Sequence, residues 1–371
     1  MKIGVSCYPT IGGSGIVATE LGCELARRGH EIHFVADEIP YRLVAHGPIF
    51  FHEVRPTDYP VFRSRPYSLA LSAKLAEVAS LHGLDLFHAH YAIPHAASAF
   101  LAREMVAERR VRLVTTLHGT DITLVGADPS FFRLTKFTIE RSDGVTAVSE
   151  FLRRETIERF GITRPVATIP NFVDPERFTP ARKKELREQF GLRCGPVLMH
   201  ISNFRRVKNV RDVVKVFARV AEKTKACLVL VGDGPEREPA AILAEEYGIS
   251  DRVYFMGDQK EVEAILPAAD VFLLPSSQES FGLVALEAMS CGVPVIGCRA
   301  GGLPELVVHG ETGFLLDVGD VEGMAAAALE ILGAEPMRQR MAKAARECAV
   351  TAYPMDRVVD RYEAFYREVL A

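Results

Sequence analysis

The feature that most limits the fold is a regular alternation of short apolar runs with segments of helical periodicity. In the first half, KIGVSC, EIHFVA, DLFHAH, RLVTTLH and GVTAVS have the length of strands and are separated by helical segments such as ATELGCELARRG. The second half repeats the pattern with PVLMHIS, ACLVLVGD, RVYFMG, DVFLLPS and VPVIGC. Parallel strands need a long crossover between them, and that crossover is usually a helix. We therefore predict an α/β protein with two doubly wound, Rossmann-like domains.

The length of the chain also favours two domains. Its 371 residues exceed the size at which a single hydrophobic core keeps growing. The proline-rich segment VATIPNFVDPERFTPARKK interrupts the alternation, so we place an N-terminal domain at 1–180 and a C-terminal domain at 181–354. Pro354 breaks the helical C-terminal region, and we expect the helix at about 355–371 to pack back on the N-terminal domain. This segment and the Pro354 break are the expected hinge.

Composition and charge exclude several classes of protein. With 48% hydrophobic residues and a formal net charge of -4, the chain is typical of a folded protein with no nucleic-acid partner. The seven cysteines form no C-x-x-C pair and no Cys/His cluster at zinc spacing, which favours reduced thiols, a cytoplasmic location and no metal site. No run approaches 18 apolar residues, so we expect no membrane span. The oligomeric state stays open, and a homo-oligomer is compatible with the sequence.

The first strand is followed by a glycine-rich loop, PTIGGSGIVATE. Gly13, Ser14 and Gly15 stand at the start of a helix, in a pattern similar to a dinucleotide fingerprint. The residues Pro9, Thr10 and Ile11 make the loop longer than the tight turn that this fingerprint requires. Free N–H groups at a helix start attract anions, and glycine allows a ligand to approach closely. We predict an anion site here, with a simple connecting turn as the alternative.

Histidines follow two neighbouring strands of the first half. In HAHYAIPHA (88–96) we interpret the histidines as structural residues. His118 differs, because Thr115, Thr116 and the Gly119–Asp121 segment surround it with hydrogen-bonding groups and an accessible glycine. We therefore place His118 in the site, with Asp121 as a further candidate.

A basic segment, HISNFRRVKN (200–209), follows the first strand of the second half. Arg205, Arg206 and Lys208 gather positive charge at the end of this strand. A solvated basic loop is the common explanation for such a run. However, the matching loop of the first half is the glycine-rich one, so we predict that both loops grip one anion.

The most informative segment is ESFGLVALE, which carries Glu279 and Glu287. Glu287 lies in an otherwise apolar helix, where a buried carboxylate without partners costs several kcal/mol. The segment Ser280–Leu283 stands at the helix start, where unpaired N–H groups would bind a diphosphate. A capping box of Ser276 and Glu279 is an alternative, but it does not explain Glu287. Carboxylates accept pairs of hydrogen bonds from hydroxyls, so the pattern indicates a nucleotide sugar.

These motifs resemble the retaining glycosyltransferases of family 4, which have the two-domain GT-B fold with the domains facing across a cleft. The Glu-x7-Glu motif of that family falls on Glu279 and Glu287. Over essentially the whole chain, CYPTIGGSG, HAHYAIPHA, TLHGTDIT, IPNFVD, HISNFRRVK and SSQESFGLVALEAMSCGVPVIG resemble one branch of it. That branch transfers N-acetylglucosamine from UDP-N-acetylglucosamine to the hydroxyl of L-malate, a step of bacillithiol biosynthesis.

The resemblance implies roles for individual residues. Glu287 would hold the ribose hydroxyls and Glu279 the hydroxyls of the transferred sugar. Arg205 and Lys208 would stabilise the leaving diphosphate together with backbone amides at the helix start. The arginine that is usual in the family falls on Asn203 here, which leaves Arg205 or Arg206 as its substitute. The implied catalytic set is His118, Arg205, Lys208 and Glu279, and the implied donor-binding set is Gly13, Gly15, Ser280, Phe281, Gly282, Leu283 and Glu287.

The acceptor of the implied reaction is a dianion and needs donors and a cation. Our candidates near the glycine-rich loop are Ser14, Tyr91, Thr115, Thr116 and Arg153. No D-x-D sequence occurs in the chain, so we expect neither a metal ion nor another cofactor in the transfer. The family retains anomeric configuration and is thought to need no dedicated enzyme base.

Other functions remain open on the sequence alone. A family 4 transferase could use lactate, inositol phosphate or another sugar as acceptor, and a non-catalytic protein could bind the nucleotide sugar without turnover. A glycoside hydrolase would leave the phosphate-type loops without a purpose. An NAD-dependent oxidoreductase would use the Gly13–Ala18 loop and Asp37, and it would bind NAD rather than UDP.

Overall fold

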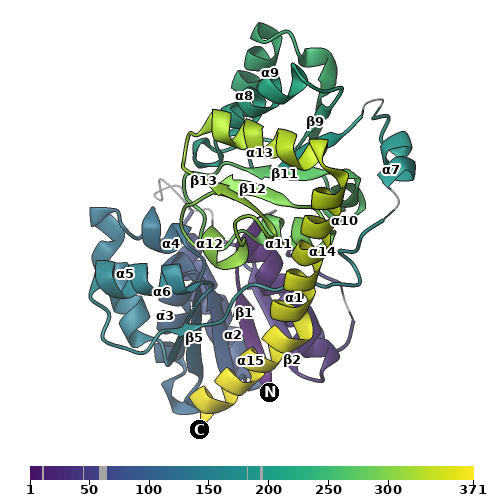
Figure 1. The fold of residues 1–371 in the computed structure, drawn as a ribbon. Helices are drawn as coiled ribbons and strands as arrows, with labels where there is room; N and C mark the ends of the chain where they lie inside the picture. Colours follow the sequence, from purple (N-terminus) through teal and green to yellow (C-terminus); the bar gives the residue numbers. More distant parts are fainter. Residues whose placement is uncertain (11, 45, 58–64, 182, 193–194) are drawn as a thin grey trace. The chain divides into compact units, whose positions relative to one another are not determined.

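The computed structural model describes residues 1–10, 12–44, 46–57, 65–181, 183–192 and 195–371 and divides into two compact units (Figure 1). Unit 1 comprises Met1–Asn171 and Asp356–Ala371, and unit 2 comprises Phe172–Met355. The division therefore comes before the 180/181 boundary that we placed from the sequence. The boundary comes earlier because the backbone of Val173 is bonded to the last part of unit 2. Its N–H donates to the carbonyl of Tyr353 (3.0 Å), and its carbonyl accepts from Met355 (2.9 Å).

Unit 1 is built on a parallel sheet of seven strands in the order β3-β2-β1-β4-β5-β6-β7. The register pairs Ile3 with both Ile32 and Leu86, so β1 lies between β2 and β4. Two short edge strands, β3 and β7, were not among the strands that we predicted. The strands are β1 (Lys2–Ser6), β2 (Glu31–Ala36), β3 (Ile49–Glu53), β4 (Leu86–His90), β5 (Arg112–Leu117), β6 (Gly144–Ala147) and β7 (Ala167–Thr168).

Some helices of unit 1 begin or end at residues with clear capping roles. Ser149 and Asp128 accept hydrogen bonds from backbone N–H groups at the starts of α6 and α5, and Gly83 and Gly161 end α2 and α6 in the left-handed conformation. The helices are α1 (Gly13–Arg27), α2 (Tyr67–His82), α3 (Ala97–Met105), α4 (Thr120–Thr123), α5 (Pro129–Arg141), α6 (Glu150–Phe160) and α15 (Met355–Leu370), with short turns η1 (Ala92–Ala96) and η2 (Ala107–Arg109).

Unit 2 is built on a parallel sheet of six strands in the order β10-β9-β8-β11-β12-β13. Its strands are β8 (Val197–Ile201), β9 (Cys227–Val231), β10 (Val253–Gly257), β11 (Val271–Leu274), β12 (Val295–Cys298) and β13 (Gly313–Leu316). Its helices are α7 (Lys183–Gln189), α8 (Val210–Ala221), α9 (Arg237–Glu246), α10 (Val262–Ile265), α11 (Leu283–Ser290), α12 (Leu303–Leu306), α13 (Val321–Gly333) and α14 (Glu335–Ala352), with turns η3 (Arg206–Lys208), η4 (Ser250–Arg252) and η5 (Leu266–Ala268).

Each sheet reverses its strand order once. In unit 1 the chain moves from β1 outward to β3 and returns to β4 on the other side of β1. In unit 2 it moves from β8 outward to β10 and returns to β11 on the other side of β8. At such a switch point the two loops after the strands diverge to opposite faces and leave a crevice at the carboxyl edge, where ligands of open α/β sheets bind.

Two further findings concern the cysteines and the length of the helices. Five cysteines have free thiols, Cys7, Cys23, Cys291, Cys298 and Cys348. Cys227 is disulfide-bonded, so the expectation of reduced thiols throughout is wrong for this residue. Within the described ranges, no helix has both the length and the apolar character that a bilayer span requires.

The C-terminal helix α15 belongs to unit 1 and is fastened to it by buried polar contacts. The hydroxyl of Tyr366, which is fully buried, hydrogen-bonds Nδ1 of His88 in β4 at 2.8 Å. At the rim, Arg28 donates to Asp360 (2.5 Å) and Glu363 (3.2 Å) of the same helix. These contacts hold α15 against the rest of unit 1.

Replacement of Tyr366 by phenylalanine tests this contact. Tyr366→Phe keeps the ring but leaves the buried Nδ1 of His88 without its partner, which should lower the free energy of unfolding by about 1 to 3 kcal/mol. Urea unfolding followed by circular dichroism measures it. Tyr247→Phe, at a tyrosine that is 41% exposed, is the control and should change stability by no more than about 0.5 kcal/mol. Equal stability of the two variants would contradict the assigned role of Tyr366.

Candidate active site

In unit 2, the loops that follow β8 and β11 are hydrogen-bonded to each other at the switch point. Ser277 donates its backbone N–H to the carbonyl of Val207 (2.9 Å), and the side chain of Asn209 donates to the carbonyl of Pro275 (2.8 Å). Asn209 has a left-handed backbone (φ 49°), as does Phe204 (φ 38°). Such conformations are uncommon outside glycine and often mark functional sites. These contacts fix the position of the basic loop after β8 (202–209) relative to the loop after β11 (275–282), which carries Glu279.

Lys208 and Glu279 meet at this junction. The Lys208 ammonium donates to a carboxylate oxygen of Glu279 at 2.8 Å, and both side chains are largely shielded from solvent, with 21% and 15% exposure. The backbone of Glu279 is fixed as well, because its carbonyl accepts from Gly302 (2.8 Å). A Cβ on Gly301 would lie 1.8 Å from the same carbonyl oxygen, so only glycine fits there. The structure therefore brings two of the predicted catalytic residues into contact.

Helix α11 begins where the sequence placed a phosphate-binding start. Gly282 adopts φ 97°, and a Cβ there would lie 2.8 Å from Leu303 Cδ1, so glycine is required. Among the described residues no side chain caps the start of α11, which contradicts the capping box of Ser276 and Glu279. The hydroxyl of Ser276 is instead buried without a hydrogen-bond partner in the described part of the chain. The first N–H groups of α11 are therefore available to a ligand.

Glu287 lies inside α11 as the sequence predicted, with 5% exposure. Phe281, just before the helix, is 3% exposed and contacts the ring of Tyr353 edge to face at 5.5 Å. Ser280 and Leu283 are half-buried on either side of this pair. The helix start is thus anchored by Phe281, while its neighbours remain partly accessible.

The two candidate arginines have different surroundings. Arg205 and Arg206 are both exposed. Arg206 lines a hollow of about 420 Å³ together with Arg211 and Asp212 of α8. No ion-pair partner of Arg205 is found among the residues that the structure describes. The same holds for Arg206 in the described part of the chain, so both arginines bring an uncommitted charge beside Lys208.

In unit 1, the switch point brings together aromatic and hydroxyl groups. The ring of Tyr8, which follows β1, contacts the ring of Tyr91, which follows β4, at 5.4 Å. Tyr91 has φ 94°. Burial raises the pKa of Tyr91, so it remains a neutral hydrogen-bond donor, although the hydroxyls of Ser14 and Thr120 lie near enough to its phenol to lower that pKa in part. Sequence reasoning missed Tyr8, although its position directly after β1 could have indicated it.

The glycine-rich loop starts α1 without a side-chain cap. Gly12 precedes the helix, and in the described part of the chain no side chain caps it. The helix packs tightly on the preceding loop, because a Cβ on Gly15 would lie 2.4 Å from the carbonyl oxygen of Tyr8. The glycine at position 15 is therefore needed for packing, while Gly13 and Ser14 lie in the first turn, where backbone N–H groups lack helical partners.

His118 lies beside this group, after β5. Its Nε2 shares a hydrogen bond with Nδ1 of His90 (2.9 Å), and its ring lies 5.4 Å from that of Tyr91. Burial and the nearby His95 lower the pKa of His118 to about 3, so the ring is neutral near pH 7. Asp121 accepts backbone N–H groups from Ala92 (3.0 Å) and Gly119 (2.8 Å), so it ties the two loops together.

Thr115 and Thr116 do not lie where the sequence predicted. Both are fully buried in β5. The hydroxyl of Thr115 bonds that of Ser142 (2.8 Å), and the hydroxyl of Thr116 bonds His88 Nε2 and Thr146 (2.7 Å each). Successive strand residues point to opposite faces, and both faces of this sheet are covered, so neither hydroxyl can reach a ligand. We therefore remove both threonines from the acceptor set.

Arg153 lies in the first turn of α6, which follows the carboxyl end of β6. It is half-buried and donates from Nε to both carboxylate oxygens of Glu150, at 2.9 and 2.8 Å. This pairing lowers the pKa of Glu150 to about 2. An acceptor anion at Arg153 would therefore compete with Glu150.

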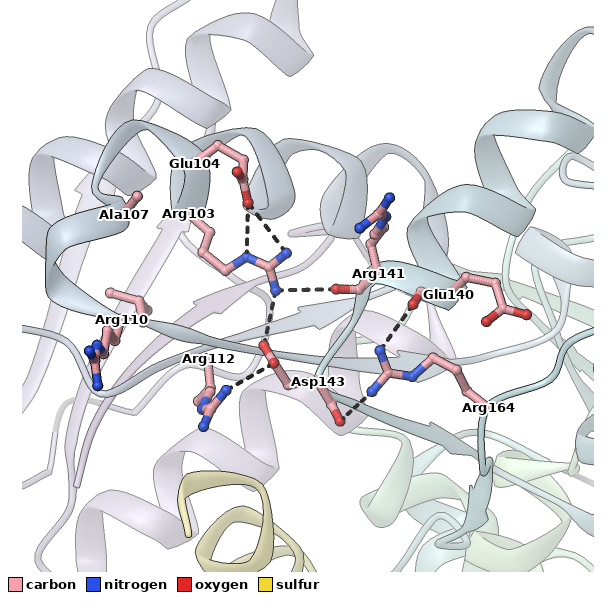
Figure 2. Close-up of a pocket in the computed structure, with 10 residues that line it drawn as sticks. Arg103, Glu104, Ala107, Arg110, Arg112, Glu140, Arg141, Asp143 and Arg164 are labelled. Carbon is pink, nitrogen blue, oxygen red and sulfur yellow. Dashed lines mark hydrogen bonds and ion pairs between the residues drawn. The ribbon is translucent and has the colours of Figure 1, made fainter.

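A separate cavity of about 520 Å³ lies at the opposite edge of the unit 1 sheet (Figure 2). Five arginines line it, and three of them are hydrogen-bonded to groups of the protein. Arg103 and Arg112 pair with Asp143, and Arg164 donates to the carbonyls of Glu140 and Asp143. Since β5 begins at Arg112 and Asp143 directly precedes β6, this cavity is at the amino edge, away from the switch point.

Each unit thus has a doubly wound parallel sheet with polar groups at its switch point, and this arrangement is typical of proteins that bind nucleotide-type ligands. Comparison with protein families agrees. Residues 11–177 match "Glycosyltransferase Family 4", and residues 182–348 match "Glycosyl transferases group 1".

Two proteins illustrate the similarity. The N-acetyl-alpha-D-glucosaminyl L-malate synthase of Bacillus anthracis is 48% identical over 372 residues, covering 100% of this chain and 97% of the relative. The Anabaena protein Alr3699/HepE, solved in complex with UDP and glucose, superposes with a TM-score of 0.82 at 21% identity, over 99% of each chain. The chain therefore belongs to glycosyltransferase family 4, and its fold is GT-B.

The buried histidines predict how stability depends on pH. Burial lowers the pKa of His88, His95 and His118 to about 3 and that of His90 well below its usual value. Between about pH 6.5 and pH 3 the unfolded chain binds protons that the folded chain does not, so stability falls as the solution is acidified. Each histidine contributes a slope of up to about 1.4 kcal/mol per pH unit. Asp121, whose pKa burial raises to about 6, opposes this between about pH 4 and 6 as a single group.

Urea unfolding at pH 7.5 and pH 5.0 tests this balance. The free energy of unfolding should be lower at pH 5.0, and His95→Asn should reduce the difference between the two pH values. His46→Asn, at an exposed histidine, should leave that difference unchanged. Stability that is equal or higher at pH 5.0 would show that the histidines are not neutral in the folded chain.

Proposed function

We propose that this chain transfers N-acetylglucosamine from UDP-N-acetylglucosamine to the hydroxyl of L-malate, with retention of anomeric configuration. The observation that carries the proposal is 48% identity along the whole chain to the Bacillus anthracis enzyme with that product in its name. Both groups of residues at the switch points are compatible with it. In bacillithiol biosynthesis this would be the step that makes N-acetylglucosaminyl malate.

The donor is assigned to unit 2. In this proposal the diphosphate binds the first N–H groups of α11, after Gly282, where a helix start favours an anion. Lys208 and Arg205 supply the compensating cations. Glu279 then accepts hydroxyls of the transferred sugar, and Glu287 accepts those of the ribose, since a carboxylate can accept two O–H bonds.

The acceptor is assigned to unit 1. Malate carries two carboxylates and one hydroxyl. Ser14 and Tyr91 offer hydroxyl donors, and the first turn of α1 offers backbone N–H groups. His118 is neutral and is held at Nε2, so its Nδ1 is the ring nitrogen that can face the sugar or phosphate. Arg153 is the candidate cation, and Tyr8 joins the set because it packs on Tyr91.

The reaction requires one bond to form and one to break at the anomeric carbon. The bond from that carbon to the phosphate oxygen breaks, and the malate hydroxyl oxygen attacks from the same face. Its proton passes to the departing phosphate, which becomes UDP. Charge grows on the diphosphate during this step, and each well-placed donor can stabilise the transition state by about 3 to 4 kcal/mol. Lys208 and the amides of α11 would act there, so no enzyme base and no metal ion are needed.

The direct test is UDP release from UDP-N-acetylglucosamine with and without L-malate, in EDTA. We expect malate-dependent release, and mass spectrometry should find N-acetylglucosaminyl malate with the α configuration by NMR. Release with inositol phosphate or lactate in place of malate would identify another acceptor. Tight UDP binding without turnover would identify a sensor, and loss of activity in EDTA would refute the metal-free mechanism.

Variants of Lys208 test the assigned charge. Lys208→Met removes the cation and should lower kcat/KM by about 10²- to 10³-fold, because the leaving diphosphate loses one donor. Lys208→Arg keeps the charge and should recover part of the rate. Lys215→Met, at a lysine that is 41% exposed and paired with Asp212, is the matched control and should keep parental activity. Equal activity of Lys208→Met and Lys215→Met would exclude Lys208 from the site.

A further inference from the structure

Three histidines of unit 1 meet at a place that plays no part in the proposed transfer. His33 lies in β2, His52 in the edge strand β3 and His82 at the last position of α2. One ring nitrogen from each lies within 4.8 Å of the others. They come from separate elements and are far apart in sequence, so the spacing of histidines in the sequence gave no sign of the cluster.

The strands and helix explain why these side chains converge. Parallel pairing places His33 opposite Phe50 and Val35 opposite His52, so both histidines point to the same face of the sheet. The buried Val35 packs in the hydrophobic core formed with α2, and α2 ends at His82. The three imidazoles are thus held by backbone elements rather than by a loop.

The cluster lies on the outer strands β2 and β3, and its third member, His82, lies at the amino edge of the sheet. Lys2, the first residue of β1, donates from its ammonium to the carbonyl of His82 at 3.1 Å. The crevice at the carboxyl edge is at the opposite end of the strands. A ligand of the three histidines would therefore not be part of the donor or acceptor site.

The hydrogen bonds around His33 orient its ring for a metal ion. Its Nε2 lies 3.0 Å from a carboxylate oxygen of Glu31, which acts as acceptor and fixes the proton on Nε2. Nδ1 then presents its lone pair toward His52 Nε2, 2.8 Å away. A histidine whose second nitrogen donates to a carboxylate is the usual arrangement of a metal-bound imidazole.

His82 is the member that internal bonding does not explain. Its ring centroid lies 4.5 Å from that of His33 and 5.3 Å from that of His52. Within the described ranges its ring nitrogens make no hydrogen bond. Phe50, which is 44% exposed, stacks on the ring of His33 at 5.0 Å. One hydrogen bond therefore joins two of the rings, and the third faces them without a shared proton.

We propose that His33, His52 and His82 bind one divalent transition-metal ion of the zinc class. Three imidazoles suit zinc, which binds nitrogen at about 2.0 to 2.1 Å and leaves a fourth position for water. Tetrahedral ligands at that length are separated by about 3.3 Å, so small rotations of the half-buried His52 and His82 complete the site. The ion would tie the edge strand β3 to the end of α2 and stabilise unit 1.

The test is titration of Zn²⁺ into the full-length chain, without a histidine tag and after removal of metals by a chelator. Calorimetry should give one Zn²⁺ per chain. His52→Gln and His82→Gln should each weaken binding at least tenfold, whereas His46→Gln, at an exposed histidine outside the cluster, should bind as the parent does. Thermal unfolding should shift upward by several degrees with Zn²⁺ in the parent and in His46→Gln only.

Two results would overturn the proposal. One is a parent chain that binds no Zn²⁺ beyond what His52→Gln binds. The other is unchanged binding in both His52→Gln and His82→Gln, which would place the ion elsewhere. His82 stands at a helix end, so His82→Gln should fold even if His52→Gln does not. Co²⁺ gives an independent readout, because tetrahedral coordination by the three histidines should produce an intense visible absorption that His82→Gln lacks.

Discussion

The constraint on which the rest of this structure depends is that parallel strands place all their carboxyl ends at one edge. Every connection must cross a face of the sheet, and each sheet reverses direction once. In unit 2, the loops that follow β8 and β11 therefore lead to opposite faces of the sheet. In unit 1, the same holds for the loops that follow β1 and β4. Residues that are distant in sequence, such as Lys208 and Glu279, can meet there only because the topology brings the two strand ends together. The ligand chemistry is thus placed by the sheet and carried out by the loops.

The ion pair of Lys208 and Glu279 gives the donor site a stable form without ligand. A half-buried lysine and a half-buried carboxylate would each be costly alone, and together they offset that cost. A diphosphate would offer Lys208 a second anion, and sugar hydroxyls would offer Glu279 new donors. In unit 2, binding would exchange this internal partner for ligand partners, so neither charged group is left without a hydrogen bond in either state.

The sequence predicted the architecture well because its strongest signals are local and periodic. The burial of Glu287 followed from the apolar helix around it, and α11 begins at Leu283, within the Ser280–Leu283 segment where we placed its start. The predictions failed where tertiary packing decides. Thr115 and Thr116 are consecutive residues of a strand covered on both faces, so their hydroxyls are used inside. The cluster of His33, His52 and His82 was missed because it needs the unpredicted edge strand β3 to place His52 beside His33. Tyr8 was missed because its value depends on contact with Tyr91, from another strand.

The central claim is that the nucleotide sugar binds at the β8/β11 switch point of unit 2. Hydrogen–deuterium exchange of the full chain with and without UDP, followed by mass spectrometry, tests it most directly. The account predicts slower exchange at 202–209 and 275–286, the two loops and the start of α11, and a weaker effect in Lys208→Met. UDP protection confined to the first turn of α1, or to the arginine-lined cavity at the amino edge of unit 1, would contradict it.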